Sequence, residues 1–325
     1  MEYNKRIDIL MATYNGEKYV EEQVKSILNQ SYKNINLIIS DDGSNDRTRE
    51  ILKKLANQDE RIKLHFQELN IGVISNFEFL MNQVTSEIFM FSDQDDIWKE
   101  FKVEHSLKKL LEDNAELIHT DLEVVDQDLN LIAESFWKLK GFYNKIIKYN
   151  NFDALYLNNF ITGCTMMMKS KWINACLPLP KNSKYMLHDY WISLVVSQRG
   201  KISYLNEATI KYRQHGDNTI GSKAYTKSLK NAKEIRNLFI DVKIQHFSIF
   251  CDNENVFIKN EIKELNKKSL LYYKKLEKNC YFNLRNIGNF MRLYKYEDLG
   301  YRIKNFMVLH TFIIFKFLYN FVKYK

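Results

Sequence analysis

The sequence predicts an α/β protein with a mostly parallel sheet flanked by helices, followed by a helical C-terminal extension. Three observations lead to this prediction. Short apolar runs alternate with amphipathic helical patterns over the first hundred residues, and the connections between them are short. Such alternation is typical of parallel strands joined by crossover helices. From Tyr225 onward the pattern is helical and contains no proline.

Each expected strand is a short apolar run bounded by turn-forming residues, and each expected helix repeats apolar residues every three to four positions. The first half predicts strands at Ile7–Ala12, Ile35–Ser40, Ile62–Phe66 and Ile88–Phe91, and helices at Glu17–Gln30, Asp46–Asn57, Asn76–Val84 and Lys99–Asn114. The second half predicts strands at Leu117–Val125, Ile161–Lys169, Ile202–Leu205 and Thr209–Tyr212, a hairpin at Asp126–Glu134 and a helix at Asp189–Gln198.

Composition excludes several other classes of protein. The 325 residues are 45% hydrophobic and 14% aromatic, which supplies a large core and argues against intrinsic disorder. The four cysteines form no CxxC pair, which favours a reduced, cytoplasmic protein over a disulfide-rich module. The polar residues 1–6 do not resemble a signal peptide. His310 and Lys316 interrupt the longest apolar stretch, Phe306–Val322, so no transmembrane helix is expected.

Charge divides the chain into two regions. Residues 226–325 carry 20 Lys and Arg against 9 Asp and Glu, whereas residues 1–225 carry 28 against 31. We therefore expect one domain over 1–222 and a basic, aromatic-rich helical region over 223–325. Two interpretations of the basic region are open: helices with a solvated face, or a peripheral contact with an anionic membrane. No nucleic-acid-binding module is present, so no nucleic-acid partner is expected.

An acidic loop follows the expected strand Ile88–Phe91. Asp93, Asp95 and Asp96 lie within four residues, and carboxylates this close repel one another unless a cation lies between them. Divalent ions such as Mg²⁺ and Mn²⁺ prefer oxygen ligands, often carboxylates together with substrate phosphates. The alternative is a solvated loop that caps the next helix. The motif favours the metal site.

Polar residues also follow the first two strands. Asp41-Asp42-Gly43-Ser44 is either a turn with a helix cap or a site where a carboxylate accepts hydrogen bonds from a base or ribose. Thr13-Tyr14-Asn15 follows the first strand. Because ligands bind at the carboxyl ends of parallel strands, these motifs and the acidic loop are expected at one edge of the sheet.

Two later motifs carry further candidate residues. Asp189 begins a helix within His188-Asp189-Tyr190-Trp191, either as an acid stabilised by the helix dipole or as a general base. Arg213 lies in Tyr212-Arg213-Gln214-His215-Gly216, and its guanidinium suits a phosphate. His215 is either a structural histidine or a ligand for a metal or phosphate.

These motifs, in this order, resemble those of family 2 glycosyltransferases with the GT-A fold. The matching series is Met11-Ala12-Thr13-Tyr14-Asn15-Gly16, Asp41-Asp42-Gly43-Ser44-Asn45-Asp46-Arg47-Thr48 and Phe91-Ser92-Asp93-Gln94-Asp95-Asp96-Ile97-Trp98. The two later motifs resemble the rhamnosyltransferase-like branch of that family. The resemblance covers about residues 5–222, and many relatives have Glu-Asp where this chain has His188-Asp189.

The resemblance implies a role for each candidate residue. Asp93 and Asp95 would form the DxD motif that binds Mn²⁺ or Mg²⁺ across the donor diphosphate, and His215 would complete that site. The extra Asp96 leaves open which two carboxylates touch the metal. Asp189 would be the general base that deprotonates the acceptor. The nucleotide pocket would be lined by Thr13, Tyr14, Asn15, Asp41, Asp42 and Asp93. Arg213 would contact the diphosphate, and the sugar or acceptor would be bordered by Thr162, Gly163 and Trp191.

The resemblance therefore implies a metal-dependent, inverting glycosyltransferase. The donor would be a nucleoside-diphosphate sugar, dTDP-rhamnose as the first expectation and a UDP-hexose as the alternative. The acceptor would be a saccharide or lipid-linked saccharide in surface polysaccharide synthesis, at the cytoplasmic face of a membrane. A degenerate protein that binds sugar nucleotides without catalysis is the non-enzymatic alternative. A dehydrogenase is disfavoured because no GxGxxG motif follows the first strand.

Overall fold

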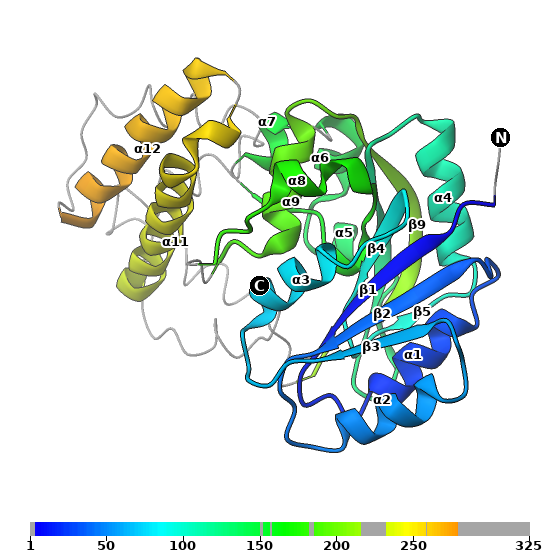
Figure 1. Ribbon diagram of the computed structural model, residues 1–325. Coiled ribbons are helices and arrows are strands. Elements are labelled where there is room, and N and C mark those ends of the chain that lie inside the picture. Colours follow the sequence, from blue (N-terminus) through cyan, green and yellow to red (C-terminus); the bar gives the residue numbers. More distant parts are fainter. Residues whose placement is uncertain are drawn as a thin grey trace. The chain divides into compact units, whose positions relative to one another are not determined.

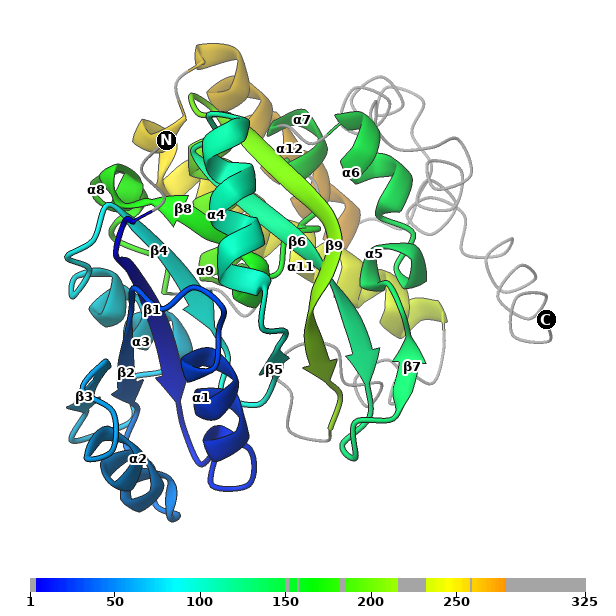
Figure 2. The same cartoon turned by 90° about the vertical axis from the view of Figure 1, so that its right-hand side faces the viewer.

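The computed structural model describes residues 4–149, 152–156, 158–181, 185–215, 232–257 and 259–278 (Figures 1 and 2). These residues form two compact units. The described parts of 1–181 and 187–215 make the first, and those of 182–186 and 216–325 make the second. The expected domain boundary at residue 222 stays a prediction.

The first unit is built on a nine-stranded mixed sheet with the strand order β3-β2-β1-β4-β8-β6-β9-β5, and β7 pairs with β6. Its strands are β1 Ile7–Thr13, β2 Ile35–Asp41, β3 Ile62–Phe66, β4 Ile88–Ser92, β5 Ile97–Trp98, β6 Leu117–Val125, β7 Leu131–Ala133, β8 Met167–Lys169 and β9 Ile202–Arg213. Strands β1 to β4 pair in parallel, as expected, and so do β6 and β9. The pairs β4–β8, β6–β8, β6–β7 and β5–β9 are antiparallel.

Helices cover both faces of this sheet. The helices of the first unit are α1 Val20–Leu28, α2 Thr48–Ala56, α3 Val73–Met81, α4 Lys102–Glu112, α5 Phe136–Leu139, α6 Tyr143–Tyr149, α7 Phe152–Leu155, α8 Ile173–Cys176 and α9 His188–Ser197. In Figure 2, α1 and α4 lie in front of the sheet, whereas α3 and α9 lie behind it. Strand β1 is therefore buried on both faces and mostly apolar, as in other sheets with helices on both sides.

One core cluster lies between the sheet and the helices α1, α2 and α4. Val24 of α1, Leu52 of α2 and Leu107 of α4 pack there against Ile9 and Leu37 of the central strands, and all five side chains are buried. At about 25 cal/mol per Å² of apolar area removed from water, burial of this kind is the main force that holds the sheet together. The site residues are therefore supported by a rigid platform.

Several boundaries differ from those expected. The strand expected at Ile161–Lys169 is wrong over its first part, because Gly163–Thr165 forms a 3₁₀ helix and only β8 pairs with neighbouring strands. The two strands expected between Ile202 and Tyr212 are one strand, β9, whose register with β6 shifts near Asp121. The hairpin expected at Asp126–Glu134 is confirmed by the pairing of β6 with β7.

The second unit contains two long helices, α11 Ala232–Asp252 and α12 Asn260–Lys278. They pack through buried aromatic rings, and the rings of Phe247 and Tyr273 stack with centroids 5.7 Å apart. The helical pattern expected after Tyr225 is thus confirmed for these stretches. None of the helices within the described ranges has the length and apolar character that a membrane crossing requires. The stretch Phe306–Val322 lies outside those ranges.

Candidate active site

The strand register brings the first three motifs to one edge of the sheet. Parallel pairing places Thr13 at the end of β1 opposite Asp41 at the end of β2. On the other side of β1, Met11 lies opposite Ser92, the last residue of β4. The loops that begin at the ends of β1, β2 and β4 therefore start side by side, although they are 28 to 79 residues apart in the chain.

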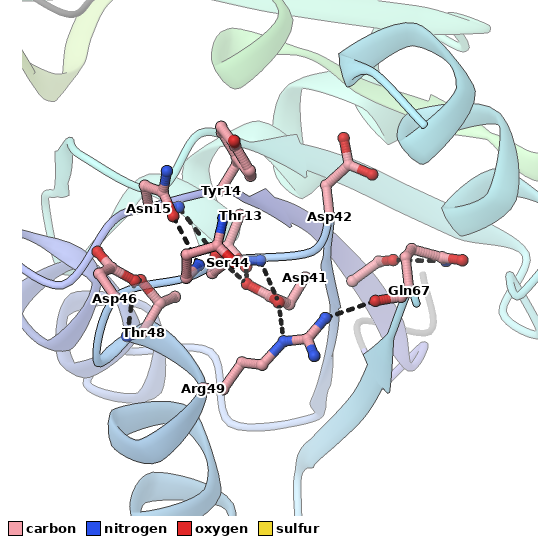
Figure 3. A network of polar contacts seen from close by, with 12 residues as sticks. Thr13, Tyr14, Asn15, Asp41, Asp42, Ser44, Asp46, Thr48, Arg49 and Gln67 are labelled. Carbon is pink, nitrogen blue, oxygen red and sulfur yellow. Dashed lines mark hydrogen bonds and ion pairs between the residues drawn. The ribbon is translucent and has the colours of Figure 1, made fainter. Parts of the chain in front are cut away.

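Asp41 is the centre of a polar network that joins three segments (Figure 3). Its carboxylate is fully buried and accepts hydrogen bonds from the hydroxyls of Thr13 (3.1 Å) and Ser44 (2.5 Å). The backbone N–H of Ser44 (3.1 Å) and the guanidinium of Arg49 (2.5 Å) donate to its other oxygen. Arg49 also donates to the carbonyl of Gln67 at 2.5 Å. Asp41 thus holds together the ends of β1, β2 and β3.

Asp42 performs a similar task for the loop between β3 and α3. Its two carboxylate oxygens accept from the backbone N–H groups of Ile71 (2.7 Å) and Gly72 (2.9 Å). Gly43 has a φ of 80°, and a Cβ there would lie 2.9 Å from the backbone nitrogen of Asn70, so only glycine fits. Both Asp41 and Asp42 bind donors of the protein itself, and their contact with a nucleotide stays a prediction.

Tyr14 and Asn15 form the loop between β1 and α1. Asn15 adopts a positive φ of 47°, its N–H donates to the Ser44 hydroxyl, and its side-chain oxygen accepts from the N–H of Asn45. Asparagine tolerates this left-handed conformation better than most residues. The Tyr14 side chain is 42% exposed. The loop therefore offers an exposed aromatic ring on a backbone fixed by the neighbouring loop, and its role in nucleotide binding stays a prediction.

The acidic loop after β4 separates its three carboxylates into different environments. Asp96 is fully buried, and one of its oxygens accepts from the backbone N–H of Arg213 at 3.2 Å. Asp93 and Asp95 are partly exposed. A carboxylate oxygen of Asp95 lies 2.8 Å from Nε2 of His215. The two carboxylates that can reach a ligand from solvent are therefore those of Asp93 and Asp95.

Two buried residues next to this loop, Cys164 and Lys102, were not predicted from the sequence motifs. The Cys164 Sγ lies within 4.8 Å of a carboxylate oxygen of Asp93 and of Asp96. Burial raises the pKa of the Cys164 thiol. The Lys102 ammonium is fully buried, 4.5 Å from the Trp98 ring, and burial lowers its pKa to about 8. A single cysteine and a helical lysine carry no sequence signal of such a role.

The electrostatics of the loop favour a bound cation. Burial, followed by the charges of Asp95 and Asp189, raises the pKa of Asp93 above its ordinary value. Burial, followed by the charges of Asp95 and Asp93, also raises the pKa of Asp96. The second oxygen of Asp96 is buried without a hydrogen-bond partner. Ligand atoms of Asp93, Asp96 and Cys164 lie within 4.8 Å of one another, which makes this a candidate metal site.

Arg213, expected to contact a phosphate, is bound by acceptors of the protein in this structure. Its guanidinium donates to the carbonyls of Asp95 (2.9 Å) and Gln127 (2.8 Å) and to the carboxylate of Glu22 (2.7 Å). It also lies over the Tyr19 ring at 4.5 Å. Arg213 therefore holds the backbone of the acidic loop, and its contact with a diphosphate stays a prediction.

Asp189 begins α9 on the side of the sheet opposite α1. Its oxygens accept from the backbone N–H groups of Tyr190 (2.6 Å) and Gly163 (3.2 Å). Burial outweighs these bonds and raises the pKa of Asp189 to about 6. Gly163, which donates to Asp189, is followed by Cys164, whose Sγ lies within 4.8 Å of a carboxylate oxygen of Asp93. The 163–164 segment therefore lies beside both carboxylates, although they are 96 positions apart in the chain. A carboxylate with such a pKa is suited to proton transfer near neutral pH.

The remaining candidates lie around Asp189. Thr162 immediately precedes Gly163, and its carbonyl accepts from the Thr165 hydroxyl at 2.6 Å. Trp191 is 1% exposed and donates from its indole nitrogen to the carbonyl of Cys176 at 2.9 Å. Trp191 is thus part of the core, and the expectation that it borders a sugar or acceptor stays a prediction, as it does for Thr162 and Gly163.

The chain belongs to glycosyl transferase family 2, whose sequence profile matches residues 8–177. It is 30% identical to a dTDP-rhamnosyl transferase, RfbG of Shigella flexneri, over 65% of this chain and 74% of that protein. It is 27% identical to a UDP-Glc:alpha-D-GlcNAc-diphosphoundecaprenol beta-1,3-glucosyltransferase, WfgD of Escherichia coli, over 72% and 87%. The fold is that of GT-A glycosyltransferases such as TarS 1–349 of Staphylococcus aureus in complex with UDP-GlcNAc. That structure has a TM-score of 0.58 and 15% identity, and the match covers 94% of this chain and 81% of the other.

The protein is therefore a glycosyltransferase, and the family resemblance of its motifs is confirmed. Named relatives use nucleotide sugars, as a dTDP-rhamnosyl transferase and a UDP-glucose-dependent enzyme. The matched segment, residues 8–177, contains the loops after β1, β2 and β4 but ends before Asp189 and His215.

Proposed function

We propose that the protein is a metal-dependent, inverting glycosyltransferase that moves a sugar from a nucleoside diphosphate to a saccharide or lipid-linked saccharide. The observation that carries this proposal is that the adjacent residues Gly163 and Cys164 lie beside both Asp189 and the acidic loop: Gly163 donates to Asp189, and the Cys164 Sγ lies within 4.8 Å of an Asp93 oxygen. Burial raises the pKa of Asp189 to about 6. Such a displacement needs a cation that neutralises the leaving group and a base that accepts a proton. An acidic loop beside a buried carboxylate can supply both.

Three side chains are assigned to the metal: Asp93, Asp95 and His215. The oxygen-rich loop, its raised carboxyl pKa values and the unpartnered oxygen of Asp96 fit a hard divalent cation such as Mn²⁺ or Mg²⁺. Burial raises the pKa of the Cys164 thiol, so Cys164 is not assigned to the metal. When bound, the metal would neutralise charge on the departing diphosphate.

Asp189 is assigned to the acceptor. It would take the proton of the acceptor hydroxyl while that oxygen bonds to the anomeric carbon. The bond from the anomeric carbon to the diphosphate oxygen breaks at the same time, and its electron pair leaves with the nucleoside diphosphate. One displacement from the opposite face inverts the anomeric configuration. The carbon becomes oxocarbenium-like on the way, as in glycoside hydrolysis.

The other candidates are assigned to binding. Tyr14 and Asn15 offer the exposed part of the nucleotide pocket, which Thr13, Asp41 and Asp42 support from within. dTDP-rhamnose is the proposed donor, supported by the similarity to a dTDP-rhamnosyl transferase. A UDP-hexose is the alternative, supported by the similarity to a UDP-glucose-dependent enzyme. Arg213 is proposed to contact the diphosphate. The sugar or acceptor is proposed to be bordered by Thr162, Gly163 and Trp191.

The proposed location is the cytoplasmic face of a membrane that carries the acceptor. Two observations support it: the excess of Lys and Arg over residues 226–325, and the similarity to an enzyme that acts on a diphosphoundecaprenol acceptor. The product would then enter surface polysaccharide synthesis. Basic helices attract anionic headgroups at about 1 kcal/mol per Lys or Arg near the surface.

The test is a screen of UDP-, GDP- and dTDP-sugars by thermal shift and by slow donor hydrolysis, with Mn²⁺ and then with EDTA. We expect one donor class to raise the melting temperature and to be hydrolysed only with the metal. A folded protein that responds to no donor contradicts the proposal and favours a non-catalytic binding protein. Hydrolysis that EDTA leaves unchanged contradicts only the metal dependence.

A further inference from the structure

Gln94, the middle residue of Asp93-Gln94-Asp95, joins the acidic loop to the loop after β1. Its side-chain oxygen accepts from the backbone N–H of Tyr14 at 2.9 Å. Its side-chain nitrogen donates to the backbone carbonyl of Tyr14 at 3.0 Å. The amide thus makes both hydrogen bonds that a neighbouring strand would make to that residue, across 80 positions of the chain.

Gly16 leaves the space that this contact occupies. A Cβ at position 16 would lie 2.3 Å from the side-chain oxygen of Gln94 and 2.6 Å from its Cδ. Gly16 is not among the glycines with positive φ, so glycine is needed here for room and not for backbone conformation. Any larger residue at position 16 must push the Gln94 amide away from Tyr14.

The backbone on either side of Gln94 is fixed by other elements. The carbonyl of Asp93 accepts from the side chain of Gln23 in α1 at 3.2 Å. The carbonyl of Asp95 accepts from the guanidinium of Arg213 at 2.9 Å. With both neighbours held, Gln94 is a short, fixed connection between the carboxylates of the acidic loop and the backbone of Tyr14.

We infer that Gln94 is a positioning residue that couples cation binding at Asp93 and Asp95 to nucleotide binding at Tyr14 and Asn15. The inference rests on the proposed function, because it requires a metal at Asp93 and Asp95 and a nucleotide at Tyr14 and Asn15. A cation bound at Asp93 and Asp95 restrains the acidic loop further, and the Gln94 amide transmits that restraint to the Tyr14 backbone. Thermodynamic linkage makes the effect reciprocal: a bound nucleotide favours the metal equally.

The test compares Gln94→Met and Gly16→Ala, which break the same contact from opposite sides. Methionine keeps the volume of glutamine but makes neither hydrogen bond. UDP, dTDP and GDP are titrated in turn into each full-length protein by calorimetry, with Mn²⁺ and with EDTA. In wild type, Mn²⁺ strengthens binding of one nucleotide. In each variant this strengthening falls by about fivefold or more, within the usual 5- to 150-fold range of coupling between sites.

The double variant and a matched control complete the design. Once methionine has replaced the amide, Gly16→Ala has no remaining contact to break, so the double variant loses no more than the worse single variant. Gln58→Met, at an exposed glutamine beyond α2, leaves the coupling unchanged. Thermal unfolding of each protein shows that the losses come from folded molecules.

Three outcomes overturn the inference. Coupling at the wild-type level in both single variants shows that the Gln94 amide carries none of it. Losses that add fully in the double variant show that Gly16 and Gln94 act separately. Wild-type protein that binds none of the three nucleotides overturns the proposed function and this inference with it, whereas the first two outcomes leave the proposed function standing.

Discussion

Single carboxylates of the site differ in role because their surroundings differ. Asp96 is buried and bonded to the backbone of Arg213, whereas Asp95 is partly exposed and paired with His215. Asp189 accepts two backbone N–H groups, yet burial still raises its pKa to about 6. The three carboxylates are therefore suited to different roles: Asp96 to structure, Asp95 to binding a cation and Asp189 to proton transfer.

Removal of the proposed base tests the last of these roles. Asp189→Asn keeps the shape of the side chain but cannot accept the acceptor proton, so transfer should fall by about 10²- to 10⁴-fold. The donor dissociation constant should stay unchanged, because Asp189 is assigned to the acceptor. Transfer is measured with saturating donor and Mn²⁺, and thermal unfolding confirms that the variant is folded. Turnover within a few-fold of wild type would remove Asp189 from this role.

A paired substitution separates the metal ligand from the structural acid. Asp95→Ala should abolish metal-dependent nucleotide binding with a small change in stability, because Asp95 is partly exposed. Asp96→Ala should instead lower the free energy of unfolding by about 1–3 kcal/mol, since it leaves the Arg213 N–H without its buried acceptor. Calorimetric titration of nucleotide with Mn²⁺ and chemical denaturation measure the two effects. If Asp96→Ala abolished metal-dependent nucleotide binding and Asp95→Ala lowered the free energy of unfolding, Asp96 would be the metal ligand and Asp95 the structural acid.

Among the elements, α9 shows most clearly how packing prepares the site. The His188 ring at its start lies against the Phe77 ring of α3, with centroids 3.9 Å apart, and near Phe91 of β4 at 5.0 Å. A Cβ on Gly163 would lie 2.7 Å from Nε2 of His188, so glycine is needed at that close approach. This packing fixes the first turn of α9 and therefore Asp189.

The buried His188 makes stability depend on pH. Burial lowers the pKa of His188 from 6.5 to about 3, so between those values the unfolded chain binds a proton that the folded protein does not. The contribution of a neutral His188 is complete above pH 6.5 and is lost below it, by up to about 1.4 kcal/mol per pH unit. His188→Phe, which keeps a flat ring, should remove this part of the dependence. Denaturant unfolding at pH 4 to 8 measures it, and parallel profiles for the two proteins would contradict it.

Local pattern predicted the elements whose structure is decided locally. Strands β1, β2 and β4 are short, mostly apolar runs that are buried on both faces, and their signal is strong. The helices α5, α7 and α8 have four residues each, too few for a period to appear. Asn206 and Glu207 have no partner in β6, and β9 continues past them because the residues on either side pair with β6, which is a tertiary effect.

The residues of the candidate site also divide into those that the local sequence pattern predicted and those that only tertiary contacts reveal. The acidic residues were found because they cluster in sequence at the ends of predicted strands. Cys164, Lys102 and Gln94 act through contacts with residues far away in the chain, and a lone residue of each type carries no pattern. The protein bonds of Arg213 were equally hidden, since its three acceptors lie in distant segments.

At the scale of the whole molecule, charge is distributed unequally along the chain. Residues 226–325 hold the excess of Lys and Arg, and the described part of this region contains α11 and α12. The acidic groups that serve the proposed chemistry lie in the first unit. One region is therefore suited to a cationic cofactor and the other to an anionic surface.

This separation predicts selective membrane binding. Full-length protein should float with vesicles that contain anionic phosphatidylglycerol and stay behind with pure phosphatidylcholine. Binding should weaken as salt rises from 0.05 to about 0.5 M, because the Debye length shortens from about 14 to 4 Å. A chain shortened to residue 225 is the control and should not float. Equal behaviour of the two chains would show that the basic region does not bind lipid.

The partners of the acidic loop also have a consequence for how the protein is made. Arg213 and His215 follow Asp95 by 118 and 120 positions, so a ribosome that adds about 5–20 residues per second delivers them about 6–24 s later. The core strands β1, β2 and β4 are by then already available to pair. The parallel pairing of β1, β2 and β4 can thus form on the nascent chain before β9, which ends at Arg213, and His215 are synthesised. The acidic loop therefore acquires these two partners only when the last strand of the sheet to be made is available.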